Sequence, residues 1–135
     1  MKLIDANVFI YALGKDHPYK EPCERVLGLV KEGRAEASVD VEMLQEILHY
    51  YHSARVLDFG VRALRQIMAA FPNPLAVSAS TVDRASGILL EHGQLQARDA
   101  VHAAAVLEND LEGIITADRG FEGIPGVKRF DPKEF

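Results

Sequence analysis

This chain of 135 residues has a single cysteine, no long uninterrupted apolar run and no excess of positive charge. Cys23 is the single cysteine, so no disulfide can form within the chain, and no zinc or redox motif surrounds it. The apolar stretch at residues 1–13 is interrupted by Asp5 and Asn7, which a signal peptide or membrane span would not carry. We therefore expect a cytoplasmic protein that is neither exported nor anchored.

The chain also lacks the surplus of basic residues that many nucleic-acid-binding proteins have. Its formal net charge is −5, from 15 Lys and Arg against 20 Asp and Glu. This balance argues against binding through a large positive face. It does not exclude a nuclease, because a metal site built from carboxylates adds acidic residues and bound divalent cations reverse the local charge.

No internal repeat, low-complexity tract or flexible linker divides the sequence. With 48% hydrophobic residues, the 135-residue chain can bury one sizeable core but is too short for two ordinary domains. We therefore expect a single domain covering residues 1–135. A serine or cysteine nucleophile paired with histidine in a recognisable motif is also missing, so the sequence does not indicate covalent catalysis.

Hydrophobic periodicity and turn residues predict strands that alternate with helices. Strands are expected at residues 2–5, 36–38, 75–78, 113–116 and 127–130. Helices are expected at residues 7–13, 18–32, 39–52, 55–71 and 97–109, and from a cap at Ser80 or Thr81 to His92. Strands separated by helices need crossover connections. The expected fold class is therefore α/β, with three layers and a central, mostly parallel sheet of four to five strands flanked by helices.

Three aspartates fall where an open α/β sheet binds ligands, beyond the carboxyl ends of its strands. Asp5 ends the first expected strand, and Asp118 follows the fourth. Asp99 lies in the first turn of the helix that precedes the fourth strand. We expect their side chains to meet in one crevice.

Glu46 must reach this crevice from a helix. Its stripe at spacings of three and four is apolar, with Val39, Met43 and Tyr50. An acid on such a packing face is costly to bury unless it meets a cation or hydrogen-bond donors. Glu46 is therefore expected to have a partner in the folded protein.

Each acid also has an ordinary structural explanation. Asp5 and Asp118 could cap a helix or a turn, and Asp99 could stabilise the first turn of its helix. Glu46 could be a solvated helix acid, with Glu42, one turn earlier, as its rival for the site. Convergence of the four acids favours a metal site, and a ligand set of carboxylates without thiolate or imidazole ligands favours Mg²⁺ or Mn²⁺ over zinc.

The residues around these acids resemble the motifs of a known family. The matching segments, in chain order, are LIDANVFIYA at residues 3–12, QEIL at 45–48, ARDAVHAA at 97–104, TADRGF at 116–121 and the closing stretch at 124–132. The chain resembles PIN-domain ribonucleases, and among them the VapC toxins of toxin–antitoxin pairs. Ala6, where threonine or serine is common, and Glu122, where aspartate is common, depart from the pattern.

The resemblance implies a PIN-like fold and a metal-dependent endoribonuclease that hydrolyses RNA through a metal-activated water. Asp5, Asp99 and Asp118 would hold Mg²⁺ or Mn²⁺, and Glu46 would orient water or contribute to a second ion. It also implies a VapB-like antitoxin as partner and a homodimer.

Further polar residues are assigned around the four acids. The resemblance implies Asn7 and Thr116 as polar supports. Arg98 and Arg119, each next to an expected ligand, are candidates for phosphate contact, with solvated arginines as the alternative. His102, three residues after Asp99, is expected either to donate to a ligand or to pack in the core.

Three other functions remain open from the sequence. A solitary PIN nuclease in RNA processing would carry the same four acids. An inactive PIN-like binding module would act through its surface, although the intact acidic set argues against it. A receiver-like phosphoacceptor domain would need an aspartate at the end of the third strand, and residues 75–78 lack one.

Overall fold

The computed structural model describes residues 1–135. Its four strands are β1 (Lys2–Ile4), β2 (Ala37–Ser38), β3 (Gly113–Ile115) and β4 (Lys128–Phe130). Its helices are α1 (Ala6–Leu13), α2 (Lys20–Lys31), α3 (Val41–Ser53), α4 (Leu57–Ala70), α5 (Ala79–Glu91) and α6 (Ala97–Glu108), with short 3₁₀ helices η1 (Arg119–Phe121) and η2 (Pro132–Glu134). The strand order is β2-β1-β3-β4, and every neighbouring pair is parallel. The predicted α/β fold is confirmed.

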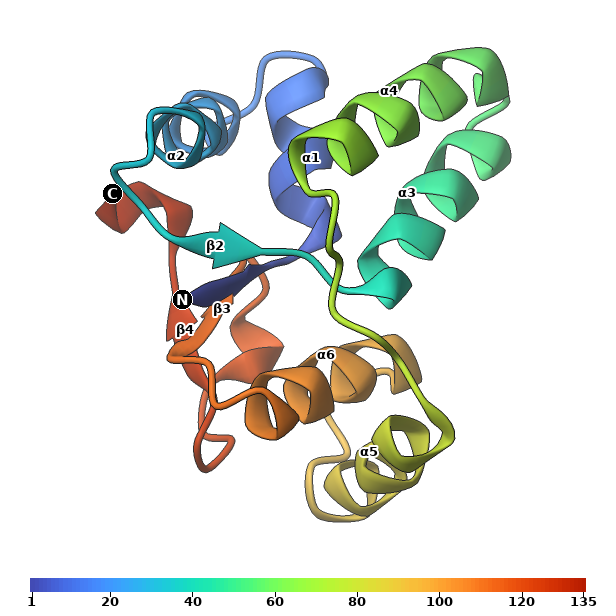
Figure 1. Ribbon diagram of the computed structural model, residues 1–135, viewed down its shortest axis with the longest axis vertical. Coiled ribbons are helices and arrows are strands. Elements are labelled where there is room, and N and C mark those ends of the chain that lie inside the picture. Colours follow the sequence, from blue (N-terminus) through green and yellow to red (C-terminus); the bar gives the residue numbers. More distant parts are fainter.

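Helices cover both faces of this sheet, with α5 and α6 on one face and α1 to α4 on the other (Figure 1). Successive residues of a strand point to opposite faces. Accordingly, Leu3 and Ile114 pack in the core under α5 and α6, whereas Ile4 and Ile115 pack in the core under α1 to α4. All four side chains are fully buried. The short central strands are therefore apolar on both faces, as expected for a parallel sheet inside three layers.

The strand predicted at residues 75–78 does not form. Leu75 makes one isolated parallel bridge with Asp40 and exchanges backbone hydrogen bonds with Val39 and Val41. Those residues lie where β2 turns into α3, so the chain leaves strand geometry after a single bridge. The prediction of a strand was wrong because a short apolar run says nothing about whether a partner strand lies beside it.

The helices are short, from 8 residues in α1 to 14 in α4, and none is long and apolar enough to span a membrane. The predicted cap of α5 at Ser80 or Thr81 was wrong. Ser78 is the cap: its hydroxyl accepts from the backbone N–H of Thr81 at 3.3 Å, and the Thr81 hydroxyl accepts from the Ser78 N–H at 3.1 Å. This reciprocal pair satisfies two backbone donors and places the helix start earlier in the chain.

The sheet brings two distant loops together at one edge. Because β1 and β3 are parallel neighbours, with Ile4 opposite Ile115, the residues that follow each strand emerge side by side. Asp5 follows β1, and Thr116, Ala117 and Asp118 follow β3. This edge is the centre of the candidate site.

Candidate active site

Asp5 lies at the bottom of the site and is 4% exposed. Its Oδ1 accepts from the backbone N–H of Ala6 at 2.7 Å and so caps α1. Its Oδ2 accepts from the Thr116 hydroxyl at 2.7 Å and from the Asn7 amide at 3.1 Å. Burial raises the pKa of Asp5 to about 6, against the lowering effect of His102 and Thr116. A buried carboxyl group with a raised pKa ionises more readily when a cation binds beside it, because the cation stabilises the charged form.

Asn7 and Thr116 join the loops that follow β1 and β3. The Asn7 amide donates to the Thr116 hydroxyl at 3.0 Å, and its carbonyl oxygen accepts from the Ala117 N–H at 3.3 Å. The Thr116 hydroxyl also accepts from the Asp118 N–H at 3.0 Å. The two residues suggested as polar supports thus tie Asp5 to the loop that carries Asp118.

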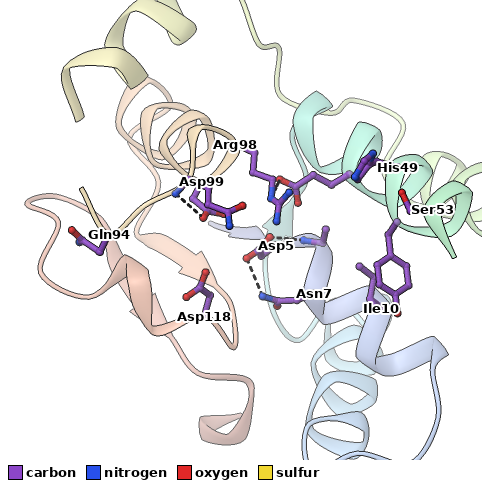
Figure 2. A pocket seen from close by; sticks show the side chains of 13 residues that line it. Asp5, Asn7, Ile10, His49, Ser53, Gln94, Arg98, Asp99 and Asp118 are labelled. Carbon is purple, nitrogen blue, oxygen red and sulfur yellow. Dashed lines mark hydrogen bonds and ion pairs between the residues drawn. The ribbon is translucent and has the colours of Figure 1, made fainter. Parts of the chain in front are cut away.

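Asp118 and Asp99 complete the set of aspartates. Asp118 caps η1 by accepting from the Gly120 N–H at 2.8 Å, and Asp99 accepts from the Gln96 N–H at 3.3 Å in the first turn of α6. The ordinary capping roles are therefore real. Both side chains nevertheless face the space above Asp5 (Figure 2). Burial raises the pKa of Asp99, and the negative charges of Asp118 and Glu46 add to the rise.

Glu46 enters from α3 with its side chain 12% exposed. Its Oε1 lies 3.1 Å from Nε2 of His102 and 3.7 Å from Nε of Arg98. The expected partner for this acid is therefore present. The apolar stripe predicted around Glu46 holds for Met43, which is buried, but Tyr50 is 45% exposed and lines the same cleft as Glu46.

The histidine beside Glu46 belongs to a buried charge cluster that sequence reasoning only half identified. His102 is fully buried, and its Nδ1 lies 2.6 Å from Oδ2 of Asp40, also fully buried. Burial works to lower the pKa of His102, but its hydrogen bonds with Asp40 and Glu46 prevail and hold that pKa well above the usual value. Asp40 was missed altogether, because an aspartate before a helix has a sufficient explanation as a cap.

The structure separates Arg98 from Arg119, and Glu46 from Glu42, by their position relative to the cleft. Arg98 lines the cleft with the four acids, whereas Arg119 lies outside it, 81% exposed, with its Nε 3.4 Å from Glu122. Glu42 lines an adjoining hollow that shares His49, Gln96 and Arg98 with the cleft but does not line the cleft itself. Glu46 is therefore the acid of α3 that lines the cleft.

A further arginine supports the loop that carries Asp118. Arg129 donates to the carbonyl oxygen of Ala117 at 3.1 Å, to Asp131 at 3.0 Å and to Glu122 at 3.1 Å. Its side chain is only 10% exposed. Nothing in the sequence around Arg129 indicated this role, since the Ala117 carbonyl comes within its reach only when β4 pairs with β3.

The four acids line one cleft of about 410 Å³, together with Asn7, Arg98 and two glutamines, Gln94 and Gln96. Oxygen atoms of Asp5 and Glu46 and a ring nitrogen of His102 lie within 4.8 Å of one another. An imidazole nitrogen, which the expected ligand set did not include, thus lies beside two of the carboxylates. Hard divalent cations prefer oxygen donors such as these carboxylates. Burial is the main cause of the raised pKa values of Asp5 and Asp99, and neighbouring negative charges add to the rise. The donor set fits Mg²⁺ or Mn²⁺.

Comparison with known proteins agrees with this fold. The family model of the PIN domain matches residues 2–127, so the chain belongs to the PIN domain family. It is 33% identical to the ribonuclease VapC13 of Mycobacterium tuberculosis over 129 residues, covering 96% of this chain and 98% of that protein. Within the family it therefore groups with the VapC ribonucleases, which are nuclease hydrolases.

Solved structures show the same fold at low sequence identity. FitAcB from Neisseria gonorrhoeae aligns with a TM-score of 0.76 and 21% identity over 100% of both chains. A toxin–antitoxin complex from Klebsiella pneumoniae aligns with a TM-score of 0.69 and 20% identity over 98% of both chains. Both solved structures thus share the parallel sheet and helical layers of this chain.

Proposed function

We propose that this protein is a Mg²⁺- or Mn²⁺-dependent endoribonuclease and the toxin of a type II toxin–antitoxin pair. The observation that carries the proposal is the convergence of four carboxylates from distant parts of the chain, Asp5, Glu46, Asp99 and Asp118, on one cleft. Membership of the VapC ribonucleases supports RNA as the substrate.

Asp5, Asp99 and Asp118 would hold the ion, with Glu46 at the side of the cleft formed by α3. When bound, the ion supplies the positive charge that activates water and offsets charge on the phosphate under attack. Asn7 and Thr116 keep Asp5 and the Asp118 loop in place. Glu46 orients the attacking water or contributes to a second ion.

Arg98 is the residue we assign to contact with the RNA phosphate. It lines the cleft, is 49% exposed and lies beside Glu46, so its guanidinium can pair with an entering phosphate. Arg119 does not share this position and already contacts Glu122. The cleft therefore offers a positive group at its rim above a negatively charged floor.

Cleavage of RNA in a metal titration tests the activity. We expect Mn²⁺ or Mg²⁺ to restore cleavage after EDTA treatment, and Asp5→Asn and Asp118→Asn each to lower the rate at least about 100-fold, because each removes a charged metal ligand. Asp83→Asn, on the exposed surface of α5, is the matched control and should keep the wild-type rate. Activity that survives EDTA, or a fully active Asp5→Asn protein, refutes the proposal.

The partner and cellular context form the second part of the proposal. The Klebsiella neighbour is a toxin–antitoxin complex, which supports a VapB-like antitoxin for this chain. We expect the toxin to act in the cytoplasm as a homodimer. An antitoxin gene next to this one, whose product relieves growth arrest on co-expression and co-purifies with the protein, would support this assignment. Lack of arrest by an active nuclease favours a solitary enzyme of RNA processing.

A further inference from the structure

His102 connects the two helices that carry the acids on either side of the cleft. It lies on α6, three residues after Asp99, and its ring contacts Asp40, the N-cap of α3, and Glu46 within α3. Both Asp40 and His102 are 0% exposed. The imidazole is therefore a buried polar link between α6 and α3 beneath the floor of the site.

Asp40 uses its two carboxylate oxygens for different tasks. Oδ1 accepts from the backbone N–H of Met43 at 2.7 Å and caps α3, whereas Oδ2 accepts from Nδ1 of His102 at 2.6 Å. A serine would serve as well for capping alone. The second oxygen orients the ring, since a charge-assisted hydrogen bond of this length restricts its rotation.

The opposite edge of the ring faces the site. Nε2 lies 3.1 Å from Oε1 of Glu46 and 3.8 Å from Oδ1 of Asp5. Burying charged groups is costly unless each meets a partner. Here the ring stands between Asp40 on one side and two acids of the cleft on the other, so its second nitrogen is aimed at the carboxylates that the proposed function uses.

We propose that Glu46 is itself a ligand of a divalent ion, and that His102, oriented by Asp40, is a positioning residue that holds the Glu46 carboxylate beside Asp5 for this purpose. The inference rests on the metal-dependent nuclease proposed above. Donors behind ligating carboxylates restrict which oxygen is presented to a metal, and their loss commonly weakens metal binding about 10- to 100-fold. Asp40 acts through His102 and does not itself contact the cleft.

Mn²⁺ affinity, measured by calorimetry without RNA, tests this arrangement. We expect His102→Gln to weaken Mn²⁺ binding about 10-fold or more, and Asp40→Ser, which keeps the cap of α3 but is too short to reach the ring, to weaken it in the same direction. The two changes combined should cost no more than His102→Gln alone, because both interrupt one chain of contacts.

A conservative variant separates positioning from mere packing. In Asp40→Asn the amide oxygen can still cap α3 and the amide N–H can donate to Nδ1 of His102, which leaves a hydrogen on Nε2 for Glu46. We expect this variant to keep Mn²⁺ affinity within about threefold of wild type. Ile67→Ala, which removes core packing in α4, should lower the melting temperature without changing Mn²⁺ affinity.

Several outcomes overturn the inference. They are unchanged or tighter Mn²⁺ binding by His102→Gln, fully additive effects in the double variant, or a ¹⁴N coupling in the electron spin echo spectrum of bound Mn²⁺ that His102→Gln abolishes, which would make the imidazole a direct ligand. If His102→Gln does not fold, the Mn²⁺ affinities of Asp40→Ser and Asp40→Asn test the inference instead. Equal affinities in these two variants overturn it.

Failure of the inference is distinguishable from failure of the proposed function. A wild-type protein that binds Mn²⁺ and cleaves RNA while His102→Gln keeps full Mn²⁺ affinity refutes only the positioning role. A wild-type protein that binds Mn²⁺ without cleaving RNA refutes only the nuclease. A wild-type protein that binds no Mn²⁺ refutes both.

Discussion

The Thr116 hydroxyl donates a hydrogen bond to Oδ2 of Asp5 at 2.7 Å, although the two residues are 111 positions apart. The same oxygen of Thr116 accepts from the Asp118 N–H and from the Asn7 amide. This buried hydroxyl thus joins the loop after β1 to the loop after β3, as does the contact between the Asn7 carbonyl oxygen and the Ala117 N–H. The relative position of Asp5 and Asp118 depends on these contacts.

Replacing Thr116 by valine should weaken the connection between the loops that follow β1 and β3. The side chain keeps its shape but leaves buried polar partners unsatisfied, so we expect Thr116→Val to lower the free energy of unfolding by about 1–3 kcal/mol. Metal-dependent cleavage should fall further than stability alone explains. Urea unfolding and cleavage rates measure the two effects.

The control for Thr116→Val is a second buried threonine away from the site. Thr81 is 1% exposed and donates to Glu108 at 2.8 Å. Thr81→Val should cost a similar amount of stability and leave the cleavage rate of the folded protein unchanged. Equal losses of activity in both variants would show that Thr116 has no special part in the site.

Asp5 predicts how the stability of the metal-free protein depends on pH. Its pKa is raised by burial from 3.8 to about 6 in the folded protein, so the folded state holds the proton more tightly than the unfolded chain does. Protonated Asp5 contributes fully to the stability of the folded state below about pH 4, and this contribution is lost as pH rises through 6. In EDTA, Asp5→Asn should therefore be more stable than wild type at pH 7.5, by up to about 3 kcal/mol.

Comparing the stability of Asp5→Asn with that of wild type at other pH values and with Mn²⁺ tests whether the ionisation of Asp5 is the cause. The advantage of Asp5→Asn should disappear near pH 4, where wild-type Asp5 is protonated too. Saturating Mn²⁺ should stabilise the wild type more than the variant, because the ion favours the ionised carboxylate. Chemical denaturation at pH 4, 6 and 7.5 measures these differences, and a constant difference across that range contradicts the assignment.

The two arginines next to site residues should behave differently. Arg98 lines the cleft, so Arg98→Ala should raise KM for RNA about 5- to 10-fold and reduce the slope of log affinity against log salt concentration by roughly 0.7 to 1, the effect of one phosphate contact. Arg119, outside the cleft, supplies the matched control, and Arg119→Ala should stay within about twofold of wild type. A larger effect of Arg119→Ala than of Arg98→Ala would contradict this assignment and place the RNA on the Arg119 side of Asp118.

Gly113 should tolerate no side chain because β3 and β4 approach closely there. A Cβ at this position would overlap the backbone carbonyl of Lys128. We expect Gly113→Ala to cost more than about 3 kcal/mol of stability, since backbone atoms cannot move aside cheaply. Gly87, in α5 with open space around it, is the control, and Gly87→Ala should stabilise the protein by about 0.5–1 kcal/mol. Thermal unfolding of both variants tests the pair.

Local patterns were sufficient for most elements of this fold. The apolar stretch before Asp5 and the run at Gly113–Ile115 identified the two central strands, because strands buried on both faces are apolar throughout. Helical segments were likewise predicted at residues 39–52 and 97–109, where α3 and α6 lie. The segment at 75–78 was misread because strand formation needs a partner, and Leu75 finds one only for a single bridge.

The sequence by itself determined the fold class and predicted Asp5 and Asp118 at one edge of the sheet, since strand-end aspartates in a parallel sheet converge through topology alone. It left open whether Glu42 or Glu46 joins them and whether Arg98 or Arg119 faces the cleft, and it gave no sign of the link between Asp40 and His102. The packing of α3 against α6 decided which glutamate joins the site and formed the link between Asp40 and His102, whereas the position of η1 outside the cleft decided between the two arginines. Neighbours within a helix are separated by fixed spacings, whereas contacts between helices depend on how the helices rotate and lie against one another.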